Sequence, residues 1–242
     1  MPTTGWETIV KGNGPRTLVL IPGAMGTASI FNAAADALAT NVRVIVASTP
    51  AEPDVNVIAD QLGLLLTTHN APKVDLLGTS FGGYAAQFFA AKYPERVGTL
   101  ILSNTMADPS FSPRRRPLEE LQAEPADEML GKAVKMIGNT PPSQTRDTLL
   151  YQLGIEAPEV FKARQVGLAM GGTAPLVDLA KINLVLIDTA DDPVVAPPAR
   201  DHLVERYSGS KRVTLDHGGH FPYVVNLDAF VKTVREAIGV PA

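Results

Sequence analysis

A serine held between two glycines, in Gly78-Thr79-Ser80-Phe81-Gly82, is the residue of this sequence best suited to nucleophilic chemistry. A buried-strand pattern that begins at Val74 leads into it, and an alanine-rich helical pattern follows. Glycines on both sides let the strand and the helix pass closely at a sharp turn, which lifts the serine hydroxyl clear of the sheet. We therefore predict that Ser80 is a nucleophile on a strained turn, and that Phe81 N–H, at the helix start, faces a developing oxyanion.

A serine hydroxyl is a weak nucleophile on its own, so it requires a base and a carboxylate that orients the base. Histidine suits the first role because its ordinary pKa, about 6.5, lets it take and return a proton near neutrality. The sequence offers Asp191 and Asp192 after one apolar run, and His217 and His220 after the next. Loops at the carboxyl ends of strands meet at one edge of an open α/β sheet, so these residues can approach Ser80. The prediction of a nucleophilic serine depends on these candidate acids and bases, because a Gly-x-Ser-x-Gly pattern alone arises by chance in roughly one chain in ten of this length.

The elements that would position these residues alternate along the chain. Runs that are apolar on both faces are separated by helical patterns, which predicts an α/β fold with a mostly parallel central sheet flanked by helices. The first run alternates polar and apolar residues and is expected at the edge of the sheet. The predicted strands are Trp6–Val10, Thr17–Ile21, Val42–Ala47, Val74–Leu77, Val97–Leu102, Leu184–Ile187 and Lys211–Leu215.

The alternation stops over Met106–Ala180, a proline-rich stretch with helical patterns and no convincing strand. An all-helical insert between two sheet strands is typical of a lid over the mouth of the sheet. We therefore expect a single domain over residues 1–242, with a core formed by 1–105 and 181–242 and a helical cap at 106–180, inserted before the strand that carries the acid.

Composition limits the partners and cofactors of the protein. The chain has 242 residues, 45% of them apolar, a formal charge of −4 and no cysteine. Without cysteine there can be no disulfide, thiolate catalysis or cysteine-ligated metal, and the four histidines do not fall in a metal-binding spacing on one helix. The slightly acidic balance counts against nucleic acid as a partner, and the short basic run Arg114–Arg116 is expected to be solvated. We expect neither a metal nor a cofactor.

We also expect no targeting signal in this sequence. Residues 1–7 form neither a basic leader nor an apolar segment, and no apolar run is long enough to span a bilayer. We therefore expect a cytoplasmic protein without a membrane span. Its oligomeric state is left open between monomer and homodimer.

Several motifs together resemble the α/β-hydrolase superfamily along almost the whole sequence. That superfamily carries its nucleophile, acid and base in the chain order Ser, Asp, His, which is the order found here. A closer resemblance links the chain to the maspardin-like branch of the superfamily. The superfamily motifs are Pro22–Gly26, Gly78–Gly82, Asp191–Val195 and Gly218–Pro222, and the closer resemblance lies in Leu76–Tyr84, Leu100–Thr105 and Gly218–Tyr223.

The resemblance implies a role for each matched residue. Ser80 would be the nucleophile and His220, which follows a Gly-Gly pair, the general base. Asp192, next to a proline, would be the acid. Asp191 remains a rival, because Thr189 stands where the superfamily usually has a glycine and the register can shift by one residue.

The same resemblance implies an oxyanion hole formed by Phe81 N–H and Ala24 N–H. Many relatives carry His-Gly where this chain has Pro22-Gly23, but the backbone donor of Ala24 does not require that histidine. Met25, in the same loop, and Met106, at the start of the insert, are predicted to line the substrate pocket, because methionine supplies an adaptable apolar wall.

The expected activity is hydrolysis of small to medium carboxylic esters through an acyl-enzyme, with a small-molecule ester as the partner. Two alternatives stay open. The resemblance allows a non-catalytic interaction protein, since the maspardin-like branch includes chains in which the histidine is replaced; this sequence keeps His220, which favours an enzyme. In addition, the fold and a triad do not distinguish ester hydrolysis from perhydrolysis or carbon–carbon bond hydrolysis.

Overall fold

Seven strands form one sheet across the residues that the computed structural model describes, 5–112 and 116–241. The strand order is β1-β3-β2-β4-β5-β6-β7; β1 pairs antiparallel with β3, and the other neighbours are parallel. β1 lies at the edge, as its alternating pattern predicts, and the α/β fold with a mostly parallel sheet is confirmed. The strands are β1 (Glu7–Lys11), β2 (Thr17–Ile21), β3 (Arg43–Ser48), β4 (Val74–Thr79), β5 (Val97–Ser103), β6 (Asn183–Thr189) and β7 (Lys211–Leu215).

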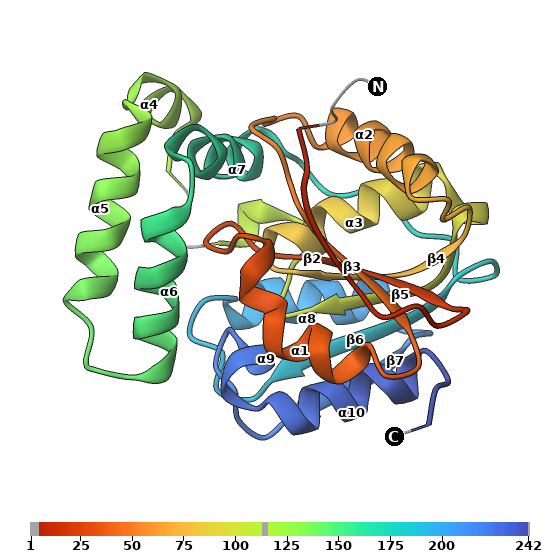
Figure 1. Ribbon diagram of the computed structural model, residues 1–242. Helices are drawn as coiled ribbons and strands as arrows, with labels where there is room; N and C mark the ends of the chain where they lie inside the picture. Colours follow the sequence, from red (N-terminus) through yellow and green to blue (C-terminus); the bar gives the residue numbers. More distant parts are fainter. Residues whose placement is uncertain (1–4, 113–115, 242) are drawn as a thin grey trace.

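Helices cover both faces of the sheet, because successive side chains of an interior strand point to opposite faces and both sets are apolar. In β2, for example, Ile21 joins one apolar core and Leu20 the other, and both are fully buried. In Figure 1, α2 and α3 lie above the sheet and α1 and α10 below it, while α8 contributes to the same core as α3. These helices are α1 (Asn32–Leu38), α2 (Val55–Thr68), α3 (Phe81–Lys92), α8 (Pro197–Arg206) and α10 (Leu227–Ala237).

The segment between β5 and β6 is helical, as the sequence predicts, and its described residues contain no strand. Figure 1 shows α5 and α6 side by side next to the sheet, with α7 leading back towards it. Leu153 of α6 and Phe161 of α7 join the core between the sheet and the helices α1 and α10, so this segment packs on the sheet-bearing part of the chain. The helices are α4 (Leu118–Ala123), α5 (Ala126–Gly138), α6 (Gln144–Ile155) and α7 (Pro158–Met170). None of the described helices is long and apolar enough to cross a bilayer.

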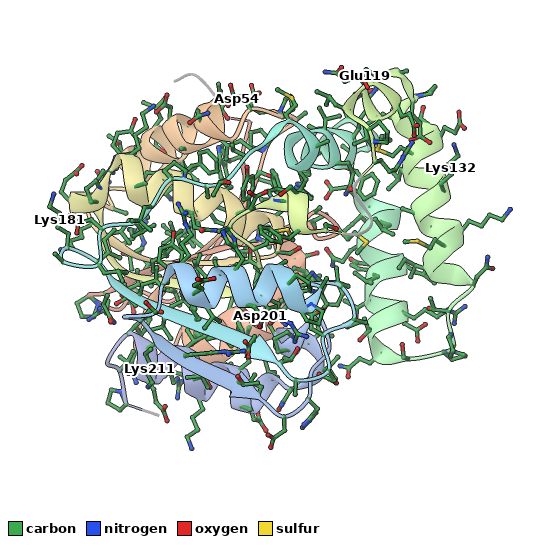
Figure 2. The ribbon with its side chains drawn as sticks, turned by 180° about the vertical axis from the view of Figure 1, so that it is seen from behind. Asp54, Glu119, Lys132, Lys181, Asp201 and Lys211 are labelled. Carbon is green, nitrogen blue, oxygen red and sulfur yellow. The ribbon has the colours of Figure 1, made fainter. Side chains whose placement is uncertain are left out.

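Two ion pairs link charged side chains within this helical segment. Lys132 of α5, labelled in Figure 2, pairs with Glu124 at 2.7 Å. Arg116, the last arginine of the basic run, pairs with the same carboxylate at 2.6 Å. The other two arginines, Arg114–Arg115, lie outside the described residues, as do residues 1–4 of the N-terminal stretch.

Candidate active site

Ser80 stands on a sharp turn between β4 and α3. Its backbone angles, φ 51° and ψ −122°, are rare for a residue with a side chain, so the surrounding packing must hold it there. A Cβ on Gly78 would lie 2.3 Å from Gly82 O, and one on Gly82 would lie 2.3 Å from Ile21 O. Glycine is therefore the residue that lets strand and helix pass this closely.

Backbone contacts secure the turn on both sides. Ser80 N donates to Ser103 O at 3.2 Å, and Ser80 O accepts from Tyr84 N at 3.0 Å and from Thr105 Oγ1 at 2.5 Å. The Ser80 backbone is thus fixed by the neighbouring strand and by its own helix. Phe81, the first residue of α3, buries its ring completely, while its amide lies at the positive end of the helix.

His220 and Asp192 form a buried pair at the same edge of the sheet. Asp192 follows β6 and His220 follows β7, and His220 Nδ1 lies 3.0 Å from Asp192 Oδ2 and 3.2 Å from Oδ1. The two residues are only 5% and 8% exposed. With Asp192 ionised, Nδ1 carries the proton and donates it, which leaves Nε2 as the acceptor nitrogen of the ring.

The hydrogen bonds around Asp192 favour its charged form. Its Oδ1 accepts from Val194 N at 2.7 Å and from Val195 N at 3.2 Å, and its Oδ2 accepts from Asn104 Nδ2 at 2.9 Å. Burial is the largest single influence on the pKa of Asp192 and raises it. The hydrogen bonds from His220, Asn104 and Val194, together with the charge of His220, act in the opposite direction. Their sum is larger, so the pKa of Asp192 lies below its ordinary value. The carboxyl group is therefore ionised at neutral pH.

Asp191, the other candidate for the acid, binds backbone amides and not the imidazole. It is exposed, and its two oxygens accept from Gly218 N at 3.3 Å and from Gly219 N at 2.8 Å. The structure thus brings Asp192 to the imidazole, whereas Asp191 accepts from backbone amides of the loop that precedes His220. His217 is exposed, and its backbone carbonyl accepts from Asn226 Nδ2 at 2.9 Å.

Asn104 belongs to the site although the sequence analysis gives it no role. It follows β5 directly, adopts φ 45° and is 2% exposed. Besides Asp192, its Nδ2 contacts Thr189 Oγ1 at 3.0 Å and Gly219 O at 3.2 Å, so one amide joins the loops after β5, β6 and β7. An asparagine just after a buried strand, at the edge where the other candidates lie, was the available signal.

The loop after β2 lies against the serine. A Cβ on Gly23 would be only 2.9 Å from Ser80 Cβ, and the next residue, Ala24, is 9% exposed. Gly26 N donates to Gly23 O at 3.2 Å and closes the loop into a turn. Ala24 thus follows a residue that lies against Ser80, and both Ala24 and Ser80 line the same cavity.

A cavity of about 250 Å³ opens beside these groups. Ser80 and His220 line it, and so do both predicted pocket residues, Met25 and Met106. No hydrogen bond links the Ser80 hydroxyl to His220 in the described part of the chain; such contacts are often long before substrate binds. The other walls are mainly apolar and include Leu121, Met136, Phe161, Leu168, Phe221 and Tyr223. Within residues 5–112 and 116–241, no three His, Asp or Glu side chains gather as a metal site would require.

Comparison with known proteins gives a consistent result. The pattern of the Alpha/beta hydrolase family matches residues 18–233. Human maspardin is 26% identical over 235 residues, a match that covers 87% of this chain and 72% of maspardin. A pimeloyl-[acyl-carrier protein] methyl ester esterase of Neisseria meningitidis serogroup A is 25% identical over 203 residues, which cover 76% of this chain and 62% of that protein. Among solved structures, a thermophilic esterase from Thermogutta terrifontis has the same fold, with a TM-score of 0.80, 22% identity and coverage of 96% of this chain and 92% of that one. These matches confirm the resemblances drawn from the sequence motifs.

Proposed function

Because the chain belongs to the alpha/beta hydrolase family, we propose that it hydrolyses small to medium carboxylic esters through an acyl-enzyme on Ser80. The observation that carries this proposal is the buried His220–Asp192 pair on the same cavity as a serine on a strained turn. Esterases among the relatives and structural neighbours support the reaction class. In this proposal Ser80, His220 and Asp192 form a Ser-His-Asp triad.

The proposed acylation step uses Ser80, His220 and the two backbone amides. Ser80 Oγ attacks the ester carbonyl carbon while its proton passes to His220 Nε2, and the electrons of the C=O bond move onto the carbonyl oxygen. Ala24 N–H and Phe81 N–H donate to that oxyanion, each contributing about 3–4 kcal/mol of barrier stabilisation if it behaves as a typical donor. The tetrahedral intermediate then collapses, the bond to the alcohol oxygen breaks, and His220 returns the proton to the departing alcohol.

Deacylation repeats the same steps with water. A water molecule gives a proton to His220 Nε2 and attacks the acyl carbon, and the second intermediate expels Ser80 Oγ, which regains the proton. Asp192 stays a carboxylate throughout, because its pKa is lowered in the site. It holds the imidazole in the tautomer with the proton on Nδ1 and stabilises the imidazolium that forms in each half-reaction.

The cavity supports an uncharged acyl group of modest size. Apolar space of about 150 Å³ is enough to hold benzene, and this cavity is larger. Met25 and Met106 would contact the acyl group as adaptable walls. Leu121, Phe161 and Leu168 of the segment between β5 and β6 also line the cavity, which supports the proposal that residues 106–180 act as a lid on a single domain.

The likeness to maspardin is compatible with one alternative, a non-catalytic interaction protein built on the same fold. The two functions differ in one measurable property, the reactivity of Ser80. An enzyme of the proposed kind reacts with a fluorophosphonate probe at Ser80, whereas an interaction protein leaves this serine unlabelled. Perhydrolysis and carbon–carbon bond hydrolysis would use the same triad and are separated only by the products formed.

The test is an ester screen of the wild type and Ser80→Ala in parallel. We expect turnover of p-nitrophenyl esters by the wild type, best for acyl chains that fit the cavity, and a loss of at least about 1000-fold in Ser80→Ala. Equal turnover by a folded Ser80→Ala protein would refute the mechanism. An absence of both turnover and probe labelling in the folded wild type would favour the interaction protein.

A further inference from the structure

Arg164 of α7 is a fully buried cation in which each of the three guanidinium nitrogens has a hydrogen-bond partner. Its side chain is 0% exposed, and Nη1 pairs with Glu156 at 2.6 Å. Nε donates to Thr49 Oγ1 at 2.8 Å, and Nη2 donates to Ser48 Oγ at 2.8 Å and Thr49 O at 3.2 Å. A charge is costly to bury unless it is paired and hydrogen-bonded, so this arrangement fixes α7 against the end of β3.

The same guanidinium reaches the loop that carries Ala24. Its Nη1 donates to Gly26 O at 3.2 Å and, at the longer distance of 3.5 Å, to Ala24 O. Gly26 N in turn donates to Gly23 O. A trans peptide points its N–H and C=O to opposite sides, so the direction of Gly23 O also sets the direction of Ala24 N–H. Arg164 therefore holds the turn that aims the amide of Ala24.

A second helix of the same segment holds the far end of this loop. Gln152 of α6 is 3% exposed, and its Oε1 accepts from Thr27 N at 3.0 Å and from Thr27 Oγ1 at 2.7 Å. Its Nε2 donates to Ser29 Oγ at 3.0 Å. The loop is thus fixed by buried polar side chains from α6 and α7 and not only by its own turn.

We propose that Arg164 is a positioning residue for the oxyanion hole, which keeps Ala24 N–H directed at the carbonyl oxygen of a bound ester. The inference rests on the proposed esterase function and adds a residue that touches neither substrate nor triad. Under this proposal α7 positions the oxyanion hole through Arg164 and also forms part of the cavity wall, which contains Phe161, Gln165 and Leu168. A misplacement of about 1 Å in such a donor can cost on the order of 100-fold in rate.

The test compares Arg164→Lys with a control on the same helix. Lysine keeps the positive charge beside Glu156, but its single ammonium cannot reach the loop carbonyls, Ser48 and Thr49 together. The control is Lys162→Met, because among the described residues Lys162 Nζ donates only to Gln122 O and Glu124 O, both within the helical segment. It changes the packing of α7 in the segment and leaves the loop contacts of Arg164 in place.

In folded Arg164→Lys we expect kcat on p-nitrophenyl butyrate to fall by roughly 10- to 100-fold, with KM changed by less than about threefold. Binding of a trifluoromethyl ketone, which forms a tetrahedral adduct on Ser80, should weaken in proportion to kcat. The pH dependence of kcat/KM should keep its midpoint, since the His220–Asp192 pair is untouched. Lys162→Met should retain wild-type kcat within about twofold.

A folded Arg164→Lys protein with wild-type kcat, or one in which only KM rises, would overturn the inference. Should Arg164→Lys fail to fold, the double variant Glu156→Gln/Arg164→Met leaves no buried charge unpaired and is expected to show the same loss of kcat. Retention of kcat in that variant would overturn the inference equally. The proposed function fails by a different result, a wild type without activity or an active Ser80→Ala, so the two failures can be distinguished.

Discussion

Removal of the Asn104 side chain should lower the free energy of unfolding by an amount that depends on pH. Its Nδ2 donates to Asp192 Oδ2 at 2.9 Å, and the residue sits at φ 45°. Alanine at this position would remove the amide and also add backbone strain. Glycine adopts the same conformation freely, so Asn104→Gly removes the amide without that strain, and Asn104→Ala serves as the matched comparison.

The expected magnitude follows from the charge of the acceptor. A hydrogen bond to a charged group contributes about 1.5–3 kcal/mol, so Asn104→Gly should lower the free energy of unfolding by about 2 kcal/mol at pH 7. The left-handed conformation costs alanine about 1–2 kcal/mol. After subtracting the greater freedom of glycine in the unfolded chain, Asn104→Ala should be less stable than Asn104→Gly by roughly 0.5–1 kcal/mol.

The pH dependence has a definite sign. The pKa of Asp192 is lower in the folded protein than in the unfolded chain, so the stabilisation is present above the unfolded-state pKa, about 3.9. It is lost as the pH falls through the folded-state pKa, because the protonated carboxyl group no longer gains from the donors. The difference in stability between wild type and Asn104→Gly should therefore be full at pH 7 and shrink below about pH 4.

Urea unfolding followed by circular dichroism at pH 7, 5 and 3.5 measures this difference directly. The value of kcat/KM on p-nitrophenyl butyrate at pH 7 should fall as well, since Asp192 loses one of the groups that orient it. A variant as stable as the wild type at pH 7 would refute the reasoning. So would a stability difference that is the same at pH 7 and pH 3.5.

Further predictions concern the acid, the turn and the cavity. Asp192→Asn should lower kcat on the order of 10⁴-fold because the amide favours the wrong imidazole tautomer, whereas Asp191→Asn should cost less than about tenfold; steady-state kinetics would contradict this if the two losses were equal. Gly78→Ala should destabilise the fold by more than about 3 kcal/mol in urea unfolding, since its Cβ would lie 2.3 Å from Gly82 O, and a wild-type unfolding midpoint would count against the turn geometry. Met106→Trp should fill part of the cavity and shift the preferred p-nitrophenyl ester to a shorter acyl chain, and an unchanged preference would exclude Met106 from the acyl wall.

Local sequence patterns were sufficient to predict the strands and the turn that position the candidate site. The apolar runs and the glycines around Ser80 predict the strands and the sharp turn, because both depend on residues next to one another in the chain. The choice between Asp191 and Asp192 was beyond such patterns. It depends on how one loop turns relative to His220, and only the folded backbone sets that.

Side chains that join distant segments were also beyond prediction. Asn104 contacts residues 85 and 115 positions further along the chain, and Arg164 contacts carbonyl groups up to 140 residues before it. The place of Asn104 just after a buried strand indicates the edge of the sheet where it lies but not these contacts, and Arg164 belongs to no spacing that indicates chemistry. A buried arginine in a helix is indistinguishable in sequence from a solvated one, since its partners come from other elements.

Helix α7 is attached to the loop after β2 and to the end of β3 through Arg164, and it also lines the cavity. This combination bears on how the protein could be redesigned. Helical segments between β5 and β6 are attractive units to exchange between relatives when a new substrate preference is sought. Here such a graft would cut the contacts from Arg164 to Gly26 and to Thr49 at the same time as it replaced the cavity wall. A chimera that carries over an arginine at this position, with a loop that can receive it, should keep its turnover, and one that does not should bind its new substrate and convert it slowly.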